Sequence, residues 1–169
     1  MFDFKYDIPL GIEYGDYDDQ IIGSSQQWSG YYPVNGKLNS STAWCPSSDD
    51  KDKHPWIQVN LKEEKFMTSV TLQGRKDANQ YVTKFRVLYS KDGKIFEHLE
   101  EFMGLTNVTQ TQKYWFNIPV FCKAIKLQVL EYSGHPSLRF EFGYIPNYLV
   151  NKKIVYLNSN ETKNSETSQ

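Results

Sequence analysis

Two stretches of alternating residues, joined by a polar loop, constrain the fold of this chain most. In residues 66–73 the side chains predicted to share one face are Phe66, Thr68, Val70 and Leu72. In residues 83–90 the corresponding set is Thr83, Phe85, Val87 and Tyr89. A period of two is typical of half-buried β-strands, and the D-G pair at positions 92 and 93 favours a tight turn into a further strand. The centre of the chain is therefore predicted to be strand, loop, strand and turn, and loop 74–80 is presented by a rigid sheet.

The same alternation recurs along the rest of the chain. The residues predicted to point inward from these further strands are Ile57, Val59, Leu61, Tyr114, Phe116, Ile118, Ile125, Leu127, Val129, Leu138, Phe140 and Phe142. No stretch has a convincing helical period. Many short alternating strands with turns marked by glycine and proline predict an all-β sandwich or barrel.

Length and charge limit the function classes. The 169 residues suit one domain with a sizeable core, followed by a tail. The 19 basic and 20 acidic residues nearly cancel, so the bulk charge gives no reason to expect a nucleic-acid partner. No apolar run reaches the length needed to span a bilayer. Residues 147–169 are predicted to form a polar C-terminal tail or linker, because residues 158–169 contain few hydrophobic residues.

The sequence contains no pattern that predicts catalysis. His54, His98 and His135 are scattered and lack the spacing of a metal-binding helix or finger. There is no nucleophile elbow, phosphate loop or dinucleotide-binding glycine pattern. We therefore expect a protein that is not an enzyme.

Six motifs together resemble one known family. They are L-Q-G-R-x-x-x-x-Q-Y-V-T-x-F-x-V-x-Y-S-x-D-G from Leu72, P-L-G-I-E from Pro9, S-S-Q-Q-W-S from Ser24, A-W-C-P from Ala43, P-W-I-Q-V-N-L from Pro55 and L-R-F-E-F from Leu138. Taken in their order along the chain, these motifs resemble those of the discoidin domain, also called the coagulation factor V/VIII type C domain. The resemblance covers roughly residues 6–146. It implies a jelly-roll β-sandwich of about eight main strands over residues 1–146, with ligand-binding loops at one end.

The resemblance places the ligand site in three loops, Gln27–Tyr32, Leu38–Asp50 and Arg75–Tyr81. The candidate ligand-binding residues are Trp28, Tyr31, Tyr32, Arg75, Lys76, Asp77, Asn79 and Tyr81. An aromatic ring can cover the apolar face of a hexose, while the polar side chains bond its hydroxyl groups. Since lectin-like members of the family bind galactose-type sugars, we expect a glycan or glycoprotein ligand and a role in recognition or adhesion. Lectins of this kind often oligomerise, so a homo-oligomer is a further expectation.

Two other functions stay open. One is a protein-interaction module within a larger assembly, which would use the same loops or the tail. The other is binding to an anionic phospholipid surface, for which Trp28, Tyr31 and Tyr32 would be the amphipathic tips. Acidic residues in the same loops oppose an anionic surface, so a membrane partner fits less well than a sugar.

Several residues also have structural interpretations. Arg75 could form a salt bridge with Asp77 instead of binding a ligand. The residues for which we expect a purely structural role are Trp44 and Trp56, in the core or at the mouth of the barrel, and Arg139 and Glu141, as a pair on one strand.

No cofactor is expected to be required. Related sugar-binding sandwiches hold a structural calcium ion, and the resemblance transfers that role to Asn35, Asn39, Thr42 and Glu141 as weak candidates.

The two cysteines bear on the compartment. Many family members join their two ends by a disulfide, but the corresponding positions here hold Tyr6 and Tyr144. In collagen-receptor relatives the position of Cys45 pairs with a cysteine near the last strand, where this chain has Ser137. We therefore expect Cys45 and Cys122 to be free, with a bridge between them as the alternative.

Free thiols and the lack of a signal-like N-terminal sequence favour a cytoplasmic or non-classically secreted protein. The alternative is a fragment of an extracellular or cell-surface protein, for which N-x-S/T triplets at positions 39, 107 and 160 give light support.

Overall fold

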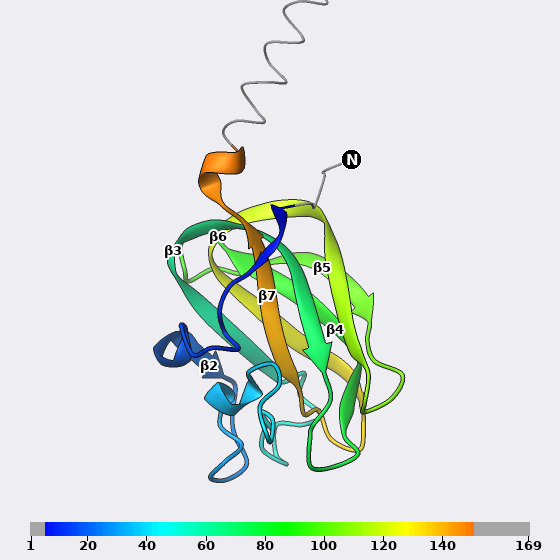
Figure 1. The fold of residues 1–169 in the computed structure, drawn as a ribbon. Helices are drawn as coiled ribbons and strands as arrows, with labels where there is room; N and C mark the ends of the chain where they lie inside the picture. The colour runs from blue at the N-terminus through cyan, green and yellow to red at the C-terminus, as the bar shows by residue number, and fades with distance from the viewer. Residues whose placement is uncertain (1–5, 151–169) are drawn as a thin grey trace, which may run out of the picture.

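The computed structural model describes residues 6–150, and these form an antiparallel β-sandwich (Figure 1). Its strands are β1 (Ile8–Pro9), β2 (Ile21–Gly23), β3 (Trp56–Gln73), β4 (Tyr81–Ser90), β5 (Glu97–Met103), β6 (Thr111–Ser133) and β7 (Arg139–Ile145). The strand order is β1-β7-β3-β6-β4-β5, with β2 paired to β3. Two short 3-10 helices, η2 (Asp18–Gln20) and η3 (Pro33–Gly36), lie in the loops before β3. The predicted all-β sandwich is confirmed.

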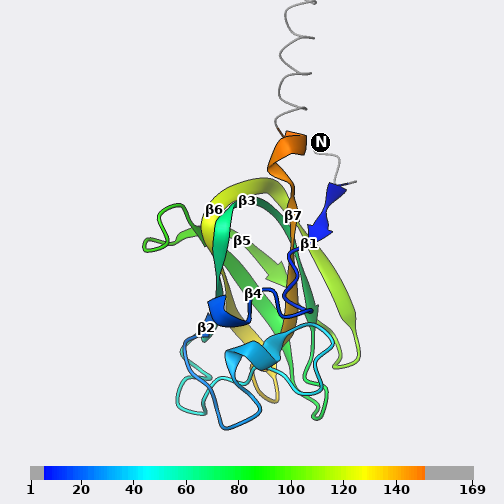
Figure 2. The same cartoon turned by 60° about the vertical axis from the view of Figure 1, so that its left-hand side comes forward.

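Two long strands belong to both layers of the sandwich. The first part of β3 pairs with β2 and with the second part of β6, beside β4 and β5. The second part of β3 pairs with β7 and with the first part of β6. Figures 1 and 2 show β3 and β6 bending over the end of the molecule opposite the loops. Each of them joins two strands that the sequence predicted separately, so seven strands are assigned within residues 6–150 in place of about eight.

Aromatic side chains connect the two layers. The Phe85 ring of β4 lies 5.0 Å from the Tyr114 ring of β6 and 5.2 Å from the Phe102 ring of β5, measured between centroids. Phe85 and the first part of β6 are in different layers, so this contact crosses the sandwich. Trp44 is fully buried, as predicted, whereas Trp56 is only half-buried under the Lys126 ammonium group, which is 4.2 Å from its ring centre.

Two β-bulges change which side chains face the core, so the predicted faces are wrong near them. Relative to β7, β3 has one extra residue at Thr68, which reverses the alternation. Met67 is therefore buried in the core with Val70 and Leu72, whereas Phe66 lies outside it against Phe121, 4.6 Å away between ring centres.

In β4 the extra residue is Thr83, so that Val82 replaces it in the core beside Phe85 and Val87. Ile118, predicted to point inward, is 66% exposed. The other predicted inward residues are buried or pack against the core.

The ends of the sandwich differ in content. Figure 1 shows the long loops gathered at one end and both described ends of the chain near the other. Residues 147–150 form a helical turn, and the rest of the predicted tail lies outside the described residues. Within residues 6–150 we find no helix that is long and apolar enough to cross a membrane.

Candidate functional site

Backbone hydrogen bonds bring the three predicted loops together at the loop end. The Lys76 amide donates to the Thr42 carbonyl at 3.1 Å, and the Thr42 hydroxyl donates to the Gly30 carbonyl at 2.8 Å. The Cys45 amide donates to the Tyr31 carbonyl at 3.2 Å. Each loop is therefore tied to another, which limits the movement of the side chains that they carry.

The Tyr31 ring is the centre of an aromatic and charged cluster. The Trp28 ring meets it edge-on with 5.6 Å between centroids. The Arg75 guanidinium lies over the ring at 4.3 Å from its centre, a cation–π contact. The Tyr31 hydroxyl donates to Asp77 Oδ2 at 2.7 Å, so the two loops also share a side-chain contact.

Arg75 and Asp77 form a two-point ion pair. Arg75 Nε and Nη2 donate to the two carboxylate oxygens at 2.6 and 3.2 Å. The hydrogen bonds from Arg75, together with the one from Tyr31, lower the pKa of Asp77 to about 2. The same pairing raises the pKa of Arg75, and the hydrogen bond to Asp77 raises that of Tyr31. The salt bridge that the sequence left as an alternative is confirmed, and it holds the guanidinium in a fixed orientation.

Hydrogen bonds connect this ion pair to Gln80 and Ser137. Arg75 Nη1 donates to Gln80 Oε1 at 3.1 Å, and the Ser137 hydroxyl donates to the same oxygen at 2.9 Å. Ser137 also contacts the sulfur of Cys45 at 3.2 Å. Sequence reasoning missed Gln80 and Ser137 as supporting residues, because Ser137 is 57 positions from Gln80.

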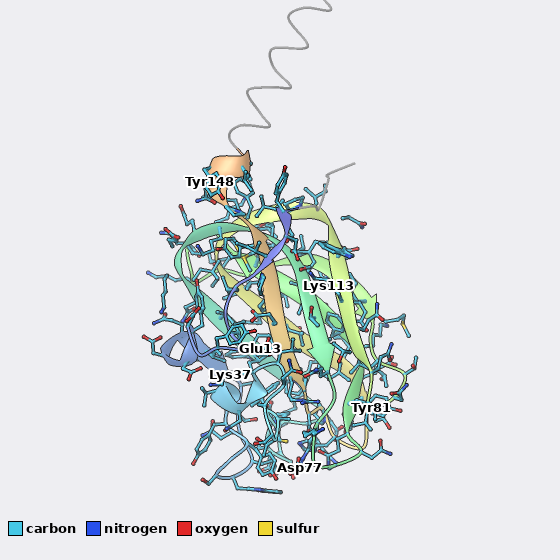
Figure 3. The ribbon with its side chains drawn as sticks, in the orientation of Figure 1. Glu13, Lys37, Asp77, Tyr81, Lys113 and Tyr148 are labelled. Atoms are coloured by element: carbon cyan, nitrogen blue, oxygen red, sulfur yellow. The ribbon has the colours of Figure 1, made fainter. Side chains whose placement is uncertain are left out.

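The remaining candidate residues divide into exposed and packed ones. Trp28 and Tyr32 are 57% and 41% exposed, and Lys76 and Asn79 are also exposed. Tyr81 is different, since it begins β4 and its side chain packs against the hydrophobic core. Figure 3 shows Asp77 at the tip of the loop end and Tyr81 farther from that tip. The structure thus brings the other seven candidates to the loop end and gives Tyr81 a packing role.

A groove of about 320 Å³ lies beside the Arg75–Tyr81 loop. Its lining residues are Asn39, Gln73, Arg75, Lys76, Ala78, Val108, Thr109, Thr111 and Arg139. Loop 105–110, which no sequence motif indicated, forms one wall. That loop can approach because residue 74 is a glycine, whose added Cβ would lie 2.9 Å from the Val108 carbonyl oxygen.

Arg139 and Glu141 are both buried, but they do not form the predicted pair. Arg139 donates to the carbonyls of Gly74 and Ser40 at 2.7 and 3.0 Å. Glu141 Oε2 accepts the Glu13 amide at 3.0 Å. Arg139 therefore ties two loops to β7, and Glu141 ties a third.

The calcium candidates are mostly engaged in protein hydrogen bonds. Asn35 Oδ1 accepts the Tyr32 amide, and Thr42 donates to a carbonyl. Asn39 Oδ1 accepts from Gln73. Glu141 Oε1 is buried and has no partner among the described residues, so it is the one candidate oxygen that fits a cation. Burial also raises the pKa of Glu141, which a bound cation would oppose.

The histidines and cysteines have separate environments. His135 is buried with Nε2 2.7 Å from the Pro46 carbonyl oxygen, whereas His54 and His98 are exposed. No group of three or more His, Cys, Asp or Glu side chains within residues 6–150 could hold a metal ion.

Cys45 and Cys122 are free, as predicted, and both are buried. Burial raises the pKa of Cys122 to about 12, which makes this thiol unreactive near neutral pH.

Comparisons with known proteins agree with this geometry. The family model of the F5/8 type C domain matches residues 20–142. One of the discoidin-1 subunits of Dictyostelium discoideum is 32% identical over 116 residues, which are 66% of this chain and 45% of that protein. The chain spans less than half of the length of the curated relatives that it matches.

Solved structures share the fold at low identity. Discoidin II of Dictyostelium discoideum has a TM-score of 0.69 at 23% identity, covering 75% of this chain and 55% of that one. The family 32 CBM of C. perfringens NanJ, solved in complex with galactose, has a TM-score of 0.60 at 16% identity. That match covers 75% of this chain and 96% of the module.

Proposed function

Because the chain belongs to the F5/8 type C (discoidin) domain family, a family of binding modules, we propose that it is a non-enzymatic module that binds galactose-type carbohydrate. The observation that carries the proposal is the cluster of Trp28, Tyr31, Arg75 and Asp77 at the loop end. It combines an exposed aromatic ring with a guanidinium whose orientation is fixed.

The cluster has the chemistry that a hexose needs. The exposed faces of Trp28 and Tyr32 can cover the apolar side of a sugar ring. Arg75 and Asp77 supply donors and acceptors beside them, and the exposed Lys76 and Asn79 supply more. Since the ion pair is already formed, little side-chain freedom is lost when a ligand binds.

The relatives support the sugar class. The NanJ module, which shares this fold, was solved with galactose, and a second module of the same fold, from Clostridium perfringens, was solved with GalNAc-β-1,3-galactose. Transfer of that ligand class to this chain is part of our proposal. A single sugar site of this kind binds weakly, so we expect an oligomer or clustered copies to raise the strength of attachment.

A protein partner is the second candidate, and the thiols are the observation that favours it. Two free, buried cysteines are suited to a compartment that keeps thiols reduced, which is a cytoplasmic location or one reached without classical secretion. In that setting Trp28 and Tyr32 would be anchors for a protein surface. A cell-surface fragment that binds glycans is the opposing case.

The test is a glycan array with the folded protein displayed in several copies. We expect hits with terminal galactose-type sugars that are lost in Trp28→Ala, because this substitution removes the exposed ring. The matched control is Trp115→Ala, since Trp115 is 40% exposed on β6, outside the three loops. Its hits should persist.

A blank array with folded, multivalent protein would contradict the carbohydrate proposal. Two further measurements then separate the alternatives. Capture of a specific protein that Trp28→Ala fails to bind would support the interaction module. Binding to phosphatidylserine vesicles that weakens with salt would support the phospholipid surface.

A further inference from the structure

The groove beside loop 75–81 has more positive than negative charge in its lining. Three of its residues are basic, namely Arg75, Lys76 and Arg139, and none of them is acidic. Asp77 balances only Arg75. Lys76 is exposed, so one cation without a described acidic partner lies at the rim of the groove.

Arg139 is the unusual member of this set. It is 8% exposed, and its bonds go to two carbonyl oxygens, those of Gly74 and Ser40. Among the described residues no carboxylate oxygen lies within 4.0 Å of its guanidinium. Carbonyl dipoles compensate a buried charge only in part, and burial lowers the pKa of Arg139. An anion in the groove would supply the missing charge.

The neutral part of the groove is preformed. Asn39 and Gln73 form two hydrogen bonds with each other. The backbone amide of Asn39 donates to Gln73 Oε1 at 2.9 Å, and Gln73 Nε2 donates to Asn39 Oδ1 at 2.8 Å. Gln73 Nε2 also donates to the Thr111 hydroxyl at 3.1 Å. Thr109 lies at the exposed rim of the same groove. These bonds hold the two side-chain amides in place, and the hydroxyl groups of Thr109 and Thr111 suit the hydroxyl groups of a sugar.

The position of the groove connects it to the aromatic cluster. Arg75 lines the groove and at the same time lies over the Tyr31 ring. A ligand of more than one sugar unit could therefore contact Trp28 with one unit and the groove with the next. The volume of about 320 Å³ is at the lower end of the range for small-molecule sites, about 300–1,000 Å³.

We propose that this groove binds the carboxylate or sulfate group of an acidic sugar, between Lys76 and Arg139. This inference rests on the proposed carbohydrate function and narrows its ligand class from neutral to acidic galactose-type glycans. The oxyanion accepts charge-assisted hydrogen bonds from the two basic side chains, and the Thr109 and Thr111 hydroxyl groups bond the neighbouring hydroxyl groups of the sugar.

The experiment is an NMR titration of the ¹⁵N-labelled protein with three matched ligands. They are methyl galactoside, the methyl glycoside of galacturonic acid, and galactose 6-sulfate. We expect the acidic sugars to bind at least about tenfold more tightly than the neutral one. The amides of Lys76 and Thr109 should shift, and the preference should shrink as salt is added.

Charge-changing variants locate the effect. Lys76→Glu and Thr109→Glu place a carboxylate at the groove and should abolish the preference for acidic over neutral sugar. Lys94→Glu makes the same charge change as Lys76→Glu in the exposed turn after β4 and should keep the preference. Arg139 is left intact, because its bonds to two carbonyls tie loops to β7 and its loss could unfold the domain.

The outcomes separate this inference from the broader proposal. Equal or weaker binding of the acidic sugars overturns the inference and leaves the neutral lectin in place. If none of the three ligands shifts any resonance, both are overturned. If inorganic sulfate alone shifts the groove as strongly as the sulfated sugar does, the groove binds a free anion and the sugar assignment is wrong.

Discussion

The Ser137 hydroxyl oxygen lies 3.2 Å from the sulfur of Cys45, although the two residues are 92 positions apart in the chain. Ser137 is where collagen-receptor relatives were expected to have a cysteine. The contact places the two side chains side by side, although only one of them is a thiol. An oxygen-to-sulfur contact of this length puts the two side chains within reach of a disulfide.

Ser137→Cys should therefore form a disulfide with Cys45 under mild oxidation. We expect the free energy of unfolding to rise by about 2–4 kcal/mol, because the cross-link closes a long loop in the unfolded chain. The measurement is urea denaturation with and without reductant, together with a count of free thiols. The variant also loses the bond from Ser137 to Gln80, so the reduced form should be slightly less stable than the parent.

Ser133→Cys is the control, since Ser133 pairs with Tyr81 at the end of β6. It should keep three free thiols and show no reductant-dependent change. Three free thiols in oxidised Ser137→Cys would contradict the geometry of the Cys45 contact.

Arg75→Gln should raise the pKa of Asp77 from about 2 towards its ordinary value of 3.8, because the bonds from Arg75 are the main cause of the shift. The pair stabilises the fold fully above the pKa of the unfolded state. This contribution is lost as the pH falls from about 4 to about 2, because the unfolded state takes up the proton first. Asp77 is exposed, so we expect the loss of stability to be below about 1 kcal/mol.

The measurement is the NMR titration of the Asp77 carboxyl carbon. Lys76→Gln removes the same charge from the adjacent residue and should leave the low midpoint in place. An equal upward shift in both variants would mean that general charge, and not the two-point bond, sets the pKa.

Alternation in the sequence predicts a β-sandwich because a strand with one buried face has to repeat every second residue. It succeeded for strands such as residues 138–142, where all three apolar side chains are fully buried. It failed where a bulge adds one residue. Thr68 is unremarkable in the sequence, yet it reverses the faces of Phe66 and Met67.

The site was predictable to a lesser degree. Motif order located all three loops, and exposed Trp28 could be inferred from a stretch that cannot bury all its aromatics. Tyr81 is the first residue of β4 and packs against the core, which a loop predicted to run from Arg75 to Tyr81 did not indicate. The groove depends on residues such as Gln73 and Thr109, which come together only through the pairing of β3 with β6. Neither composition nor spacing carries that information.

The bulge in β3 makes a testable prediction about stability. Met67→Ala should lower the free energy of unfolding by about 2–5 kcal/mol, because Met67 is fully buried. Phe66→Ala should cost clearly less, although it removes a larger side chain, because Phe66 lies outside the core and packs against Phe121. Urea denaturation of the two variants gives both values. An equal or greater loss of stability in Phe66→Ala would mean that Phe66 belongs to the buried core.

Glu141→Gln tests whether calcium binds where the resemblance places it. Burial raises the pKa of Glu141 in the folded protein. The protonated carboxyl group therefore stabilises the folded state fully below the unfolded pKa of about 4.5, and this stabilisation is lost as the pH rises through the folded pKa. Without calcium the neutral variant should therefore be at least as stable as the parent at pH 7. Its amide oxygen can still accept the bond from the Glu13 amide.

Bound calcium would reverse this order. A cation on the unpartnered Oε1 would favour the ionised folded protein, so if the site exists, excess calcium raises the Tm of the parent and a chelator lowers it. The rise should be absent in Glu141→Gln and present in Glu131→Gln, which changes an exposed glutamate on β6. An equal rise in all three proteins would place the ion elsewhere. If neither calcium nor chelator changes the Tm of the parent, Glu141 is a buried carboxyl group without a metal, held in place by backbone hydrogen bonds.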